Sequence, residues 1–372
     1  MDTEDLGGLK ARGMGDEERH EMVLDRRQML KRAGLGAAAL AVPAAVMATP
    51  SMGAVADALA ADSFIKSHPK WKFNFVNHVT TNPFFVPTIY GAQDACSLLG
   101  TSYQWTGSQT SDISQMVNAM NSAITAKASG IAVCLVSLTA FNGPTNRALG
   151  RDIPVLSYNA DAPNNRLAYV GQDLYLSGYN MGQRIVDLVG SGDVALFIAT
   201  PGQLNIQPRI DGAIAAIKKF GKGKIKTTTT ATGPLLPDEL AKIDAYYLGH
   251  KNLKRMFAVD YGSTEGVGKV MQKYGLAKKG VKAGGYDLGP PVLKAIQAGH
   301  LDFTIDQQPY LQGWIPVLQL FFYKYSSGLV APSDTNTGIL FVTKANVKPY
   351  LTTKTRYHGS SSKQKYPVTQ PG

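Results

Sequence analysis

The sequence predicts an α/β fold of two lobes, each built around a mainly parallel β-sheet. Its length of 372 residues exceeds what a single average core supports, which indicates two domains. From Trp71 onwards, short apolar runs alternate with segments of helical periodicity, and the alternation runs through two successive series. Strands that alternate with helices form parallel sheets with helices on both faces. Two such series therefore indicate two lobes of the same kind.

The first series supplies the N-terminal lobe. The segments at 131–136 and 154–158 are too short and too rich in β-branched residues for helices, which favours buried parallel strands. A helix is expected over 83–99, and another begins at Asp112, where Gln115 completes a capping box. The full set of expected strands is 73–79, 103–105, 131–136, 154–158 and 169–171.

The second series repeats this rhythm and supplies the C-terminal lobe. Its expected strands are 194–199, 225–231, 256–259, 281–286 and 303–306, and its expected helices are 206–220, 238–248, 263–274 and 290–298. No long Gly- or Ser-rich linker separates the series, so short hinge strands are expected to join the lobes. An apolar helix over 308–325 then packs back on the first lobe, and 339–342 forms a last crossing strand.

These elements predict the domain boundaries. Residues 61–171 form the N-terminal lobe, which 308–338 completes. Residues 172–307 form the C-terminal lobe, which 339–347 completes. The tail 348–372 is basic and rich in Thr, Lys and Ser, and is expected to be loosely ordered.

Residues 1–60 are interpreted as an export signal. A basic region at Arg26 and Arg27 precedes an uncharged, alanine-rich run at 33–47, and Ala-x-Ala steps suited to signal peptidase follow at 56–60. Met29, Leu30 and Lys31 continue the pattern of a twin-arginine signal. An ordinary secretory signal and an uncleaved anchor stay open as alternatives. No lipobox cysteine is present, and the predicted location is the periplasm.

Composition excludes several other classes of protein. The formal net charge is +11, but the lysines are scattered, so no nucleic-acid partner is predicted. Cys96 and Cys134 lack a CxxC spacing and are interpreted as buried free thiols, in preference to a disulfide. The six histidines are far apart, so neither a metal nor any other cofactor is predicted. The Gly-rich run 262–270 is one residue too long for a phosphate-binding loop.

Four motifs in the expected order carry a family resemblance. They are Val-Asn-His-Val-Thr-Thr-Asn-Pro-Phe-Phe at 76–85, Ala-Tyr-Val-Gly-Gln-Asp at 168–173, Gly-Gly-Tyr-Asp-Leu at 284–288 and Asp-Gln-Gln-Pro-Tyr-Leu-Gln-Gly at 306–313. Together they resemble the type I periplasmic sugar-binding proteins of ABC transporters, the relatives of ribose-binding protein, over about residues 71–343. The resemblance implies Rossmann-like lobes, a hinge of three crossovers, and a ligand between the carboxyl ends of both sheets, where open α/β sheets bind ligands.

The function that this resemblance implies is solute binding outside the cytoplasm. The chain is expected to capture a sugar or polyol by hinge closure and to present it, as a monomer, to the membrane permease of an ABC importer. No catalytic residue is predicted. A sugar-sensing adaptor for a membrane receptor is the alternative, and a glycan-processing enzyme is a weaker one. A sugar-responsive repressor shares the fold, but residues 1–60 show an export signal where it would carry a DNA-binding motif.

Sugar recognition needs flat aromatic rings against C–H faces, and planar amides or carboxylates that pair with hydroxyls. The resemblance places Phe84 and Phe85 against the ligand ring. Asn82 beside them either contacts the ligand or caps the following helix. Asn159 follows the strand at 154–158 and faces the same cleft edge. Ser137 stands where many sugar binders carry an aspartate, which argues against a ribose-like ligand.

The C-terminal lobe contributes the remaining candidates. Asp287 ends the strand at 281–286 and is expected to accept two hydroxyls, with capping before Pro290 as the alternative. Gln307 is a ligand residue or a hinge residue, and Asp260 lies at the same cleft edge. Arg209 is interpreted as a ligand contact or a structural ion pair. The helix that carries it also places Gln207 among the candidates.

Overall fold

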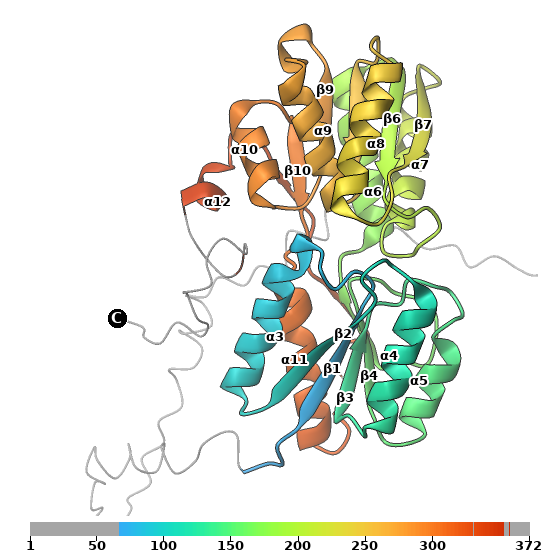
Figure 1. The fold of residues 1–372 in the computed structure, drawn as a ribbon, viewed down its shortest axis with the longest axis vertical. Helices are drawn as coiled ribbons and strands as arrows, with labels where there is room; N and C mark the ends of the chain where they lie inside the picture. The colour runs from blue at the N-terminus through green and yellow to red at the C-terminus, as the bar shows by residue number, and fades with distance from the viewer. Residues whose placement is uncertain (1–66, 330, 353–356, 358–372) are drawn as a thin grey trace, which may run out of the picture. The chain divides into compact units, whose positions relative to one another are not determined.

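The computed structural model describes residues 67–329, 331–352 and 357. These residues form two sheets of six strands each, and each sheet with its helices makes one lobe (Figure 1). The predicted fold class is therefore confirmed. The export signal predicted at 1–60 lies outside the described residues.

The N-terminal lobe contains β1 (Lys72–Asn77), β2 (Ser102–Gly107), β3 (Gly130–Val133), β4 (Val155–Tyr158), β5 (Ala168–Gly171), β11 (Asp334–Asn336), α3 (Val86–Leu98), α4 (Ile113–Thr125), α5 (Asn142–Leu149) and α11 (Leu311–Tyr325). Its strand order is β11-β5-β4-β3-β1-β2, with every neighbouring pair parallel. Strand β1 is buried from its second residue onwards, since a central parallel strand is covered on both faces. Helices α3 and α11 cover one face, and α4 and α5 cover the other (Figure 1).

The C-terminal lobe contains β6 (Gly192–Ile198), β7 (Ile225–Ala231), β8 (Arg255–Ala258), β9 (Lys282–Tyr286), β10 (Phe303–Asp306), β12 (Leu340–Val342), α6 (Leu174–Val189), α7 (Gln207–Phe220), α8 (Leu236–Gly249), α9 (Tyr261–Lys273), α10 (Pro290–Ala298) and α12 (Lys348–Thr352). Its strand order is β12-β10-β9-β8-β6-β7, and only β12 runs antiparallel to its neighbour. Apolar side chains of α6 and α7 form a core on one face of the sheet. Those of α8, α9 and α10 form a core on the other.

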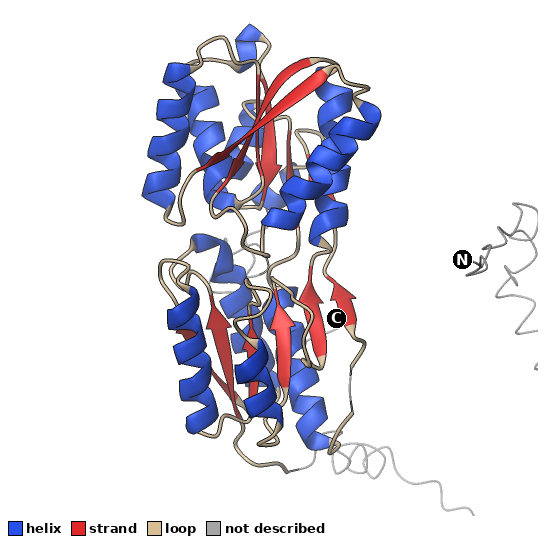
Figure 2. Cartoon of the chain, turned by 90° about the vertical axis from the view of Figure 1, so that its right-hand side faces the viewer, coloured by secondary structure: helices blue, strands red, loops and turns tan. Residues whose placement is uncertain are grey.

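Three segments cross between the lobes: 172–173, 307–310 and 337–339 (Figure 2). They are hydrogen-bonded to one another. Gln172 Nε2 donates to the Gly338 carbonyl oxygen at 3.0 Å, and Thr337 Oγ1 donates to the Gln307 carbonyl oxygen at 2.7 Å. All three crossovers therefore lie side by side, as the resemblance implied.

Local details agree with the sequence at several points. Asp112 caps α4 by accepting from the Gln115 backbone N–H at 3.1 Å, but the Asp112 N–H donates to Ser108 Oγ at 3.0 Å, so Gln115 does not complete the predicted capping box. Cys96 and Cys134 are free and buried, which confirms the thiol interpretation. Burial raises the pKa of Cys96 to about 11 and that of Cys134 to about 12.

Within the described part of the chain, no helix is long and apolar enough to cross a bilayer.

The structure also differs from the predicted elements. Helices α5 and α6 and the edge strand β11 were not expected. The tail predicted to be loosely ordered from Lys348 begins instead with α12, because Tyr350 and Leu351 pack against the C-terminal core. Tyr350 also donates a hydrogen bond from its hydroxyl to Asp306 at 3.3 Å. Most of the tail beyond α12 lies outside the described residues.

Candidate ligand-binding cleft

The carboxyl ends of the two sheets meet, and a cavity of about 120 Å³ lies between them at one side. Phe84 of the N-terminal lobe and Tyr261 and Leu288 of the C-terminal lobe are among its lining residues. The position agrees with the rule that parallel α/β sheets bind ligands beyond their strand ends. We call this junction of the two sheet edges the cleft.

Loop 199–206, which follows β6, contacts the N-terminal lobe across the cleft. Asn205 Nδ2 donates to His78 Nε2 at 3.1 Å, and Ser111 Oγ donates to Gln203 Oε1 at 2.6 Å. His78 follows β1, and Ser111 lies in the loop after β2, so neighbouring strand ends share the contact. These hydrogen bonds hold the lobes together in the arrangement that the structure shows.

Within the described residues, two side chains of this contact and Arg209 in the first turn of α7 each have a buried polar atom without a partner. Among the described residues, eight buried side-chain polar atoms lack a hydrogen bond, and three of them are His78 Nδ1, Asn205 Oδ1 and Arg209 Nε. Leaving a buried polar group unpaired costs about 1–3 kcal/mol, so native structures rarely do so without reason. A polar ligand that hydrogen-bonds to these atoms would remove the cost.

The charge state of His78 defines what such a ligand must offer. Burial lowers the pKa of His78 to about 4, so its ring is neutral near pH 7. Because Nε2 accepts from Asn205, Nδ1 carries the ring proton and is a donor. Together with Arg209 Nε, His78 Nδ1 gives the cleft two donors, and the side-chain oxygen Asn205 Oδ1 gives it one acceptor. Hydroxyl groups can satisfy both kinds of atom.

Aromatic rings line the N-terminal side of the cleft. The buried ring of Phe85 lies with its centroid 4.7 Å from Phe84, 5.3 Å from His78 and 5.8 Å from Trp105. Phe84 is partly buried and packs against the core of the C-terminal lobe. The structure therefore brings both predicted phenylalanines to the junction. It adds Trp105, at the end of β2, which the sequence analysis did not select.

Arg209 lies buried at the start of α7 and is held from three sides. Its Nη1 donates to the Val259 carbonyl oxygen at 2.8 Å, and its Nη2 donates to Gln172 Oε1 at 3.0 Å. Its guanidinium stacks 4.1 Å from the centre of the Tyr286 ring. These contacts orient the side chain and leave Nε as the free donor. Among the described residues no salt bridge forms at Arg209, so they do not support the alternative of a structural ion pair.

Asp287, Gln307 and Asn159 belong to one hydrogen-bonded chain at the hinge. Gln307 Nε2 donates to Asp287 Oδ1 at 2.7 Å, and Gln312 Nε2 donates to Gln307 Oε1 at 3.1 Å. Asn159 Nδ2 in turn donates to Gln312 Oε1 at 3.1 Å. Burial raises the pKa of Asp287 to about 7, and the Arg209 charge opposes that rise. Gln307 thus occupies the hinge position that the sequence left open, and it orients Asp287.

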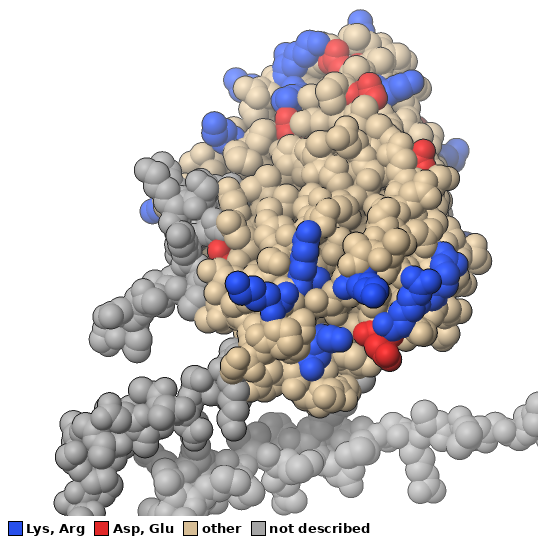
Figure 3. Space-filling view, turned by 60° about the horizontal axis from the view of Figure 1, so that its bottom comes forward, with Lys and Arg blue, Asp and Glu red and all other residues tan. Residues whose placement is uncertain are grey.

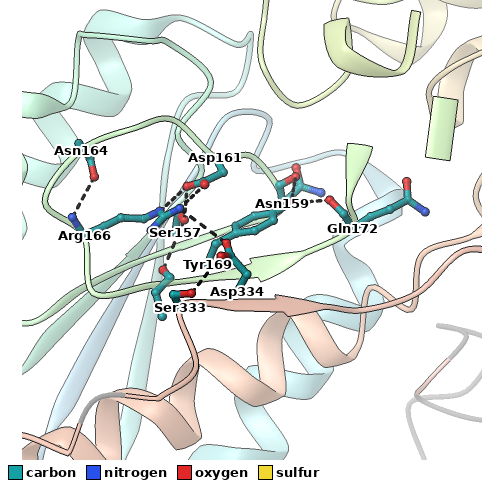
Figure 4. Close-up of polar contacts among 10 residues, drawn as sticks. Ser157, Asn159, Asp161, Asn164, Arg166, Tyr169, Gln172, Ser333 and Asp334 are labelled. Atoms are coloured by element: carbon teal, nitrogen blue, oxygen red, sulfur yellow. Dashed lines mark hydrogen bonds and ion pairs between the residues drawn. The ribbon is translucent and has the colours of Figure 1, made fainter. Parts of the chain in front are cut away.

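Tyr169 fixes the start of the first crossover, at Gln172 (Figure 4). Its hydroxyl donates to the Gln172 carbonyl oxygen at 2.9 Å and lies 3.4 Å from the Asn159 carbonyl oxygen. An ion pair between Arg166 and Asp161 lies further along the same loop, away from the cleft residues (Figure 4). The backbone at Asn159 and Gln172 is therefore anchored independently of any ligand.

Four predicted site residues have their polar groups engaged locally. Asn82 caps the turn Pro83–Phe85 through the Phe84 N–H at 2.9 Å, and Ser137 accepts from the Ala140 N–H at 3.4 Å. The amide of Gln207 bonds to Asp211 and to the Gly202 N–H, both at 2.8 Å. Both oxygens of Asp260 accept backbone N–H groups, one of them at the start of α9, each at 2.9 Å. A capping role accounts for Asn82 and Asp260, while Gln207 serves the first turn of α7.

Besides Trp105, three polar residues of the cleft were not selected from the sequence. His78 lies inside a quoted motif but was considered only as a metal ligand, and Asn205 lies two residues before Gln207. Gln172 lies inside another motif and contacts Arg209. A signal was available for Gln172, which directly follows the strand predicted at 169–171. His78 lies within the strand predicted at 73–79 and follows a strand only in the structure, where β1 ends at Asn77.

Two other chemistries gain no support from the described residues. They contain no cluster of three or more His, Cys, Asp or Glu side chains that could hold a metal ion. The Gly-rich run 262–270 lies within α9, where a Cβ on Gly262 would meet Glu239 at 2.3 Å. The run 262–270 is therefore part of a closely packed helix and not a phosphate-binding loop.

Two α/β lobes, three adjacent crossovers and a polar junction between sheet edges define a two-lobed binding protein. A model of the periplasmic binding protein domain matches residues 73–323, and the chain belongs to this family. Its relatives include the xylose/arabinose-binding protein XylF of Sulfolobus acidocaldarius. The two are 50% identical over 317 residues, which is 81% of this chain and 78% of the relative.

Solved structures show the same fold. An ABC transporter solute-binding protein from Burkholderia graminis, in complex with D-arabinose, has a TM-score of 0.70 and 27% identity, covering 75% of this chain and 97% of its own. The glucose-galactose binding protein GanP of Geobacillus stearothermophilus has a TM-score of 0.68 and 23% identity, covering 75% and 99%. The chain is thus an extracytoplasmic solute-binding protein and not an enzyme, as the sequence predicted.

Proposed function

We propose that the chain captures a neutral monosaccharide in the cleft and closes around it for delivery to an ABC permease. The observation that carries this proposal is the set of three unpaired polar atoms on His78, Asn205 and Arg209. They come from both lobes, so a ligand that bonds to all three stabilises the closed arrangement. A ligand shifts a conformational equilibrium only through such differential contacts. Delivery to a permease, the monomeric state and a periplasmic location with a twin-arginine signal are parts of this proposal.

A pentose is the sugar we favour. The relative that shares 50% identity is a xylose/arabinose-binding protein, and the Burkholderia graminis neighbour holds D-arabinose. The cleft agrees with a neutral guest, because His78 is uncharged near pH 7 and Asp287 faces the compensating charge of Arg209. Phe85 and Trp105 supply flat rings for the C–H face of a sugar.

We expect D-xylose, L-arabinose or D-arabinose to raise the melting temperature of the protein. A ligand that binds only the folded state stabilises it by about 2.7 kcal/mol at a hundred times its dissociation constant. The screen should also include D-ribose, D-glucose, myo-inositol and xylitol, each tested separately as a comparison compound of different shape. No shift with any of these compounds would contradict the proposal.

Asn205→Ala is the matched test of the site. It removes the acceptor Oδ1 and the hydrogen bond to His78, and we expect affinity to fall at least tenfold, since a lost pair of polar contacts is worth about 1–3 kcal/mol. Asp193→Asn is the control, because Asp193 is exposed at the opposite end of β6. Equal affinity in both variants would remove Asn205 from the site.

A further inference from the structure

The cavity of about 120 Å³ at one side of the cleft is lined by apolar groups in the part of the chain that the structure describes. Its described lining consists of prolines, one glycine, the aliphatic side chains of Val86 and Leu288, and the rings of Phe84, Tyr261 and Tyr357. No charged side chain is among these described lining residues. We call this space the side cavity.

The side cavity differs in this respect from the opposite end of the N-terminal lobe. A cavity of about 440 Å³ opens there at the amino ends of the strands, and its lining includes Lys127, Arg151 and Lys324. Figure 3 shows Lys and Arg side chains spread over that face. Charge therefore gathers away from the side cavity, which is suited to an uncharged, apolar group.

The side cavity adjoins the residues that we assign to the sugar. The ring of Phe84 lies with its centroid 4.7 Å from that of Phe85, which in turn lies 5.3 Å from His78. On the C-terminal side, Leu288 directly follows Asp287. A pentose that packs against the phenylalanines therefore lies beside the side cavity.

Water is a poor occupant of this space. A buried water needs about two to four polar partners, and an apolar cavity of about 150 Å³ stays dry and binds benzene. The side-chain polar atoms in the described lining are the hydroxyls of Tyr261 and Tyr357. Burial and the neighbouring carboxylate of Glu265 raise the pKa of Tyr261, whose hydroxyl is hydrogen-bonded to Glu265. A small apolar group therefore gains more from the side cavity than a water molecule or a hydroxyl does.

Contacts within the protein hold the walls of the side cavity in place. A Cβ added to Gly289 would lie 2.0 Å from the Tyr261 ring, so this ring lies directly against the backbone before α10. The ring of Tyr357 packs edge-on against Tyr310, with their centroids 4.7 Å apart. Because these walls are formed by the protein itself, a group that enters the side cavity does not have to order them first.

We propose that the side cavity binds a small alkyl group on the anomeric oxygen of the pentose, so that alkyl pentosides are better ligands than the free sugars. This inference rests on the proposed function, because the sugar ring must occupy the cleft. The other hydroxyls of a pentose need polar partners in the cleft. An alkyl group on the anomeric oxygen leaves all of them available for those contacts.

Isothermal titration calorimetry of the full chain tests this with alkyl pyranosides of D-xylose, L-arabinose and D-arabinose. Each series runs from the methyl to the octyl glycoside, in both anomers, beside the free sugar. We expect affinity to rise about fourfold with each buried CH₂ group until the side cavity is full, and then to level off. Affinity that stays flat or falls from the free sugar to the propyl glycoside in every series would overturn the proposal. So would a gain that continues undiminished to the octyl glycoside, because a bounded cavity must fill.

Val86 gives two variants with opposite expected effects, because its half-buried side chain lies in the lining at the start of α3. Val86→Phe fills the side cavity, and should abolish the gain from the alkyl chain while leaving the affinity for the free pentose unchanged. Val86→Ala enlarges the side cavity, and should move the levelling-off to a longer chain. An unchanged series in Val86→Ala would contradict the proposal even if Val86→Phe fails to fold.

Val117→Phe is the matched control. Val117 is a half-buried valine on α4 and is not among the described lining residues. We expect this variant to show the same alkyl series as the natural chain. Equal loss of the alkyl gain in Val117→Phe and Val86→Phe would overturn the assignment to the side cavity.

The free sugars separate this inference from the function on which it rests. If a free pentose binds and its glycosides gain no affinity, the side cavity is not an alkyl site and sugar capture still stands. If neither the free pentoses nor any glycoside binds, both proposals fail.

Discussion

Burial sets the protonation of the polar side chains at the cleft. Asp287 is nine-tenths or more buried, and its pKa rises to about 7, while the pKa of the equally buried His78 falls to about 4. In each case the charged form loses its hydration. Near neutral pH, therefore, the cleft presents an uncharged imidazole and a carboxyl group that titrates easily.

Replacement of Asp287 by asparagine should change how stability depends on pH. The raised pKa means that the folded protein binds a proton between about pH 4 and pH 7 that the unfolded chain has released, so the free energy of unfolding falls as pH rises through this window. Asp287→Asn removes this loss. Between pH 4 and pH 7, we expect the free energy of unfolding of the variant to rise relative to that of the natural protein by up to about 4 kcal/mol.

Denaturant unfolding of both proteins at several pH values measures the difference. Comparing the two chains cancels the opposite contribution of His78, whose lowered pKa makes stability rise with pH over the same range. A difference in unfolding free energy that stays constant from pH 4 to pH 7 would contradict the assigned pKa.

At the scale of elements, the close contact of α6 and α7 positions Arg209. A Cβ added to Gly178 would lie 2.1 Å from the Arg209 carbonyl oxygen, so the two helices touch through backbone at this point. Gly178→Ala should push α7 outwards, destabilise the fold by about 1–3 kcal/mol and weaken sugar binding. Thermal unfolding and sugar titration measure the two effects.

Gly249→Ala is the control for this substitution. Gly249 ends α8, and a Cβ there would meet no atom within 4 Å. We expect its stability and sugar affinity to match those of the natural protein. Unchanged sugar affinity in Gly178→Ala would show that the helix contact does not position Arg209.

Strands were easier to predict than helices, for a physical reason. Buried parallel strands such as β4 and β10 are short continuous apolar runs, and the sequence located both within one residue. Helix α5 has Asn, Gly and Pro in its first turn, which obscure its periodicity. Asp173 precedes helix α6 and caps it by accepting from the Leu176 N–H, but Asp173 was interpreted as part of a family motif.

The site was predictable only where topology decides it. Residues that follow parallel strands must gather at one edge, which is why Asn159, Asp287 and Phe85 were expected at the cleft edge, where the structure places them. The sequence does not show which polar groups form hydrogen bonds within the protein. Asp260 was expected at the ligand, but both of its oxygens accept backbone N–H groups. It also does not show pairs such as His78 and Asn205, which lie 127 residues apart.

At the scale of the whole molecule, two lobes are joined by three hydrogen-bonded crossovers. Each lobe has its own sheet and core, so closure changes the contacts across the cleft and leaves the lobes intact. The hydrogen bonds of loop 199–206 with His78 and Ser111 can form only when the lobes approach. A sugar bound to both sides adds to these contacts and favours the closed form.

Single-molecule fluorescence energy transfer between the lobes is the most direct test of closure around a bound sugar. Gln109→Cys and Asp238→Cys place dyes on exposed positions of the two lobes, while Cys96 and Cys134 are buried with raised pKa values and should not react. A pentose that raises the melting temperature should shift the dyes to a shorter, narrower distance distribution. The same distribution with and without a bound sugar would contradict closure around the ligand.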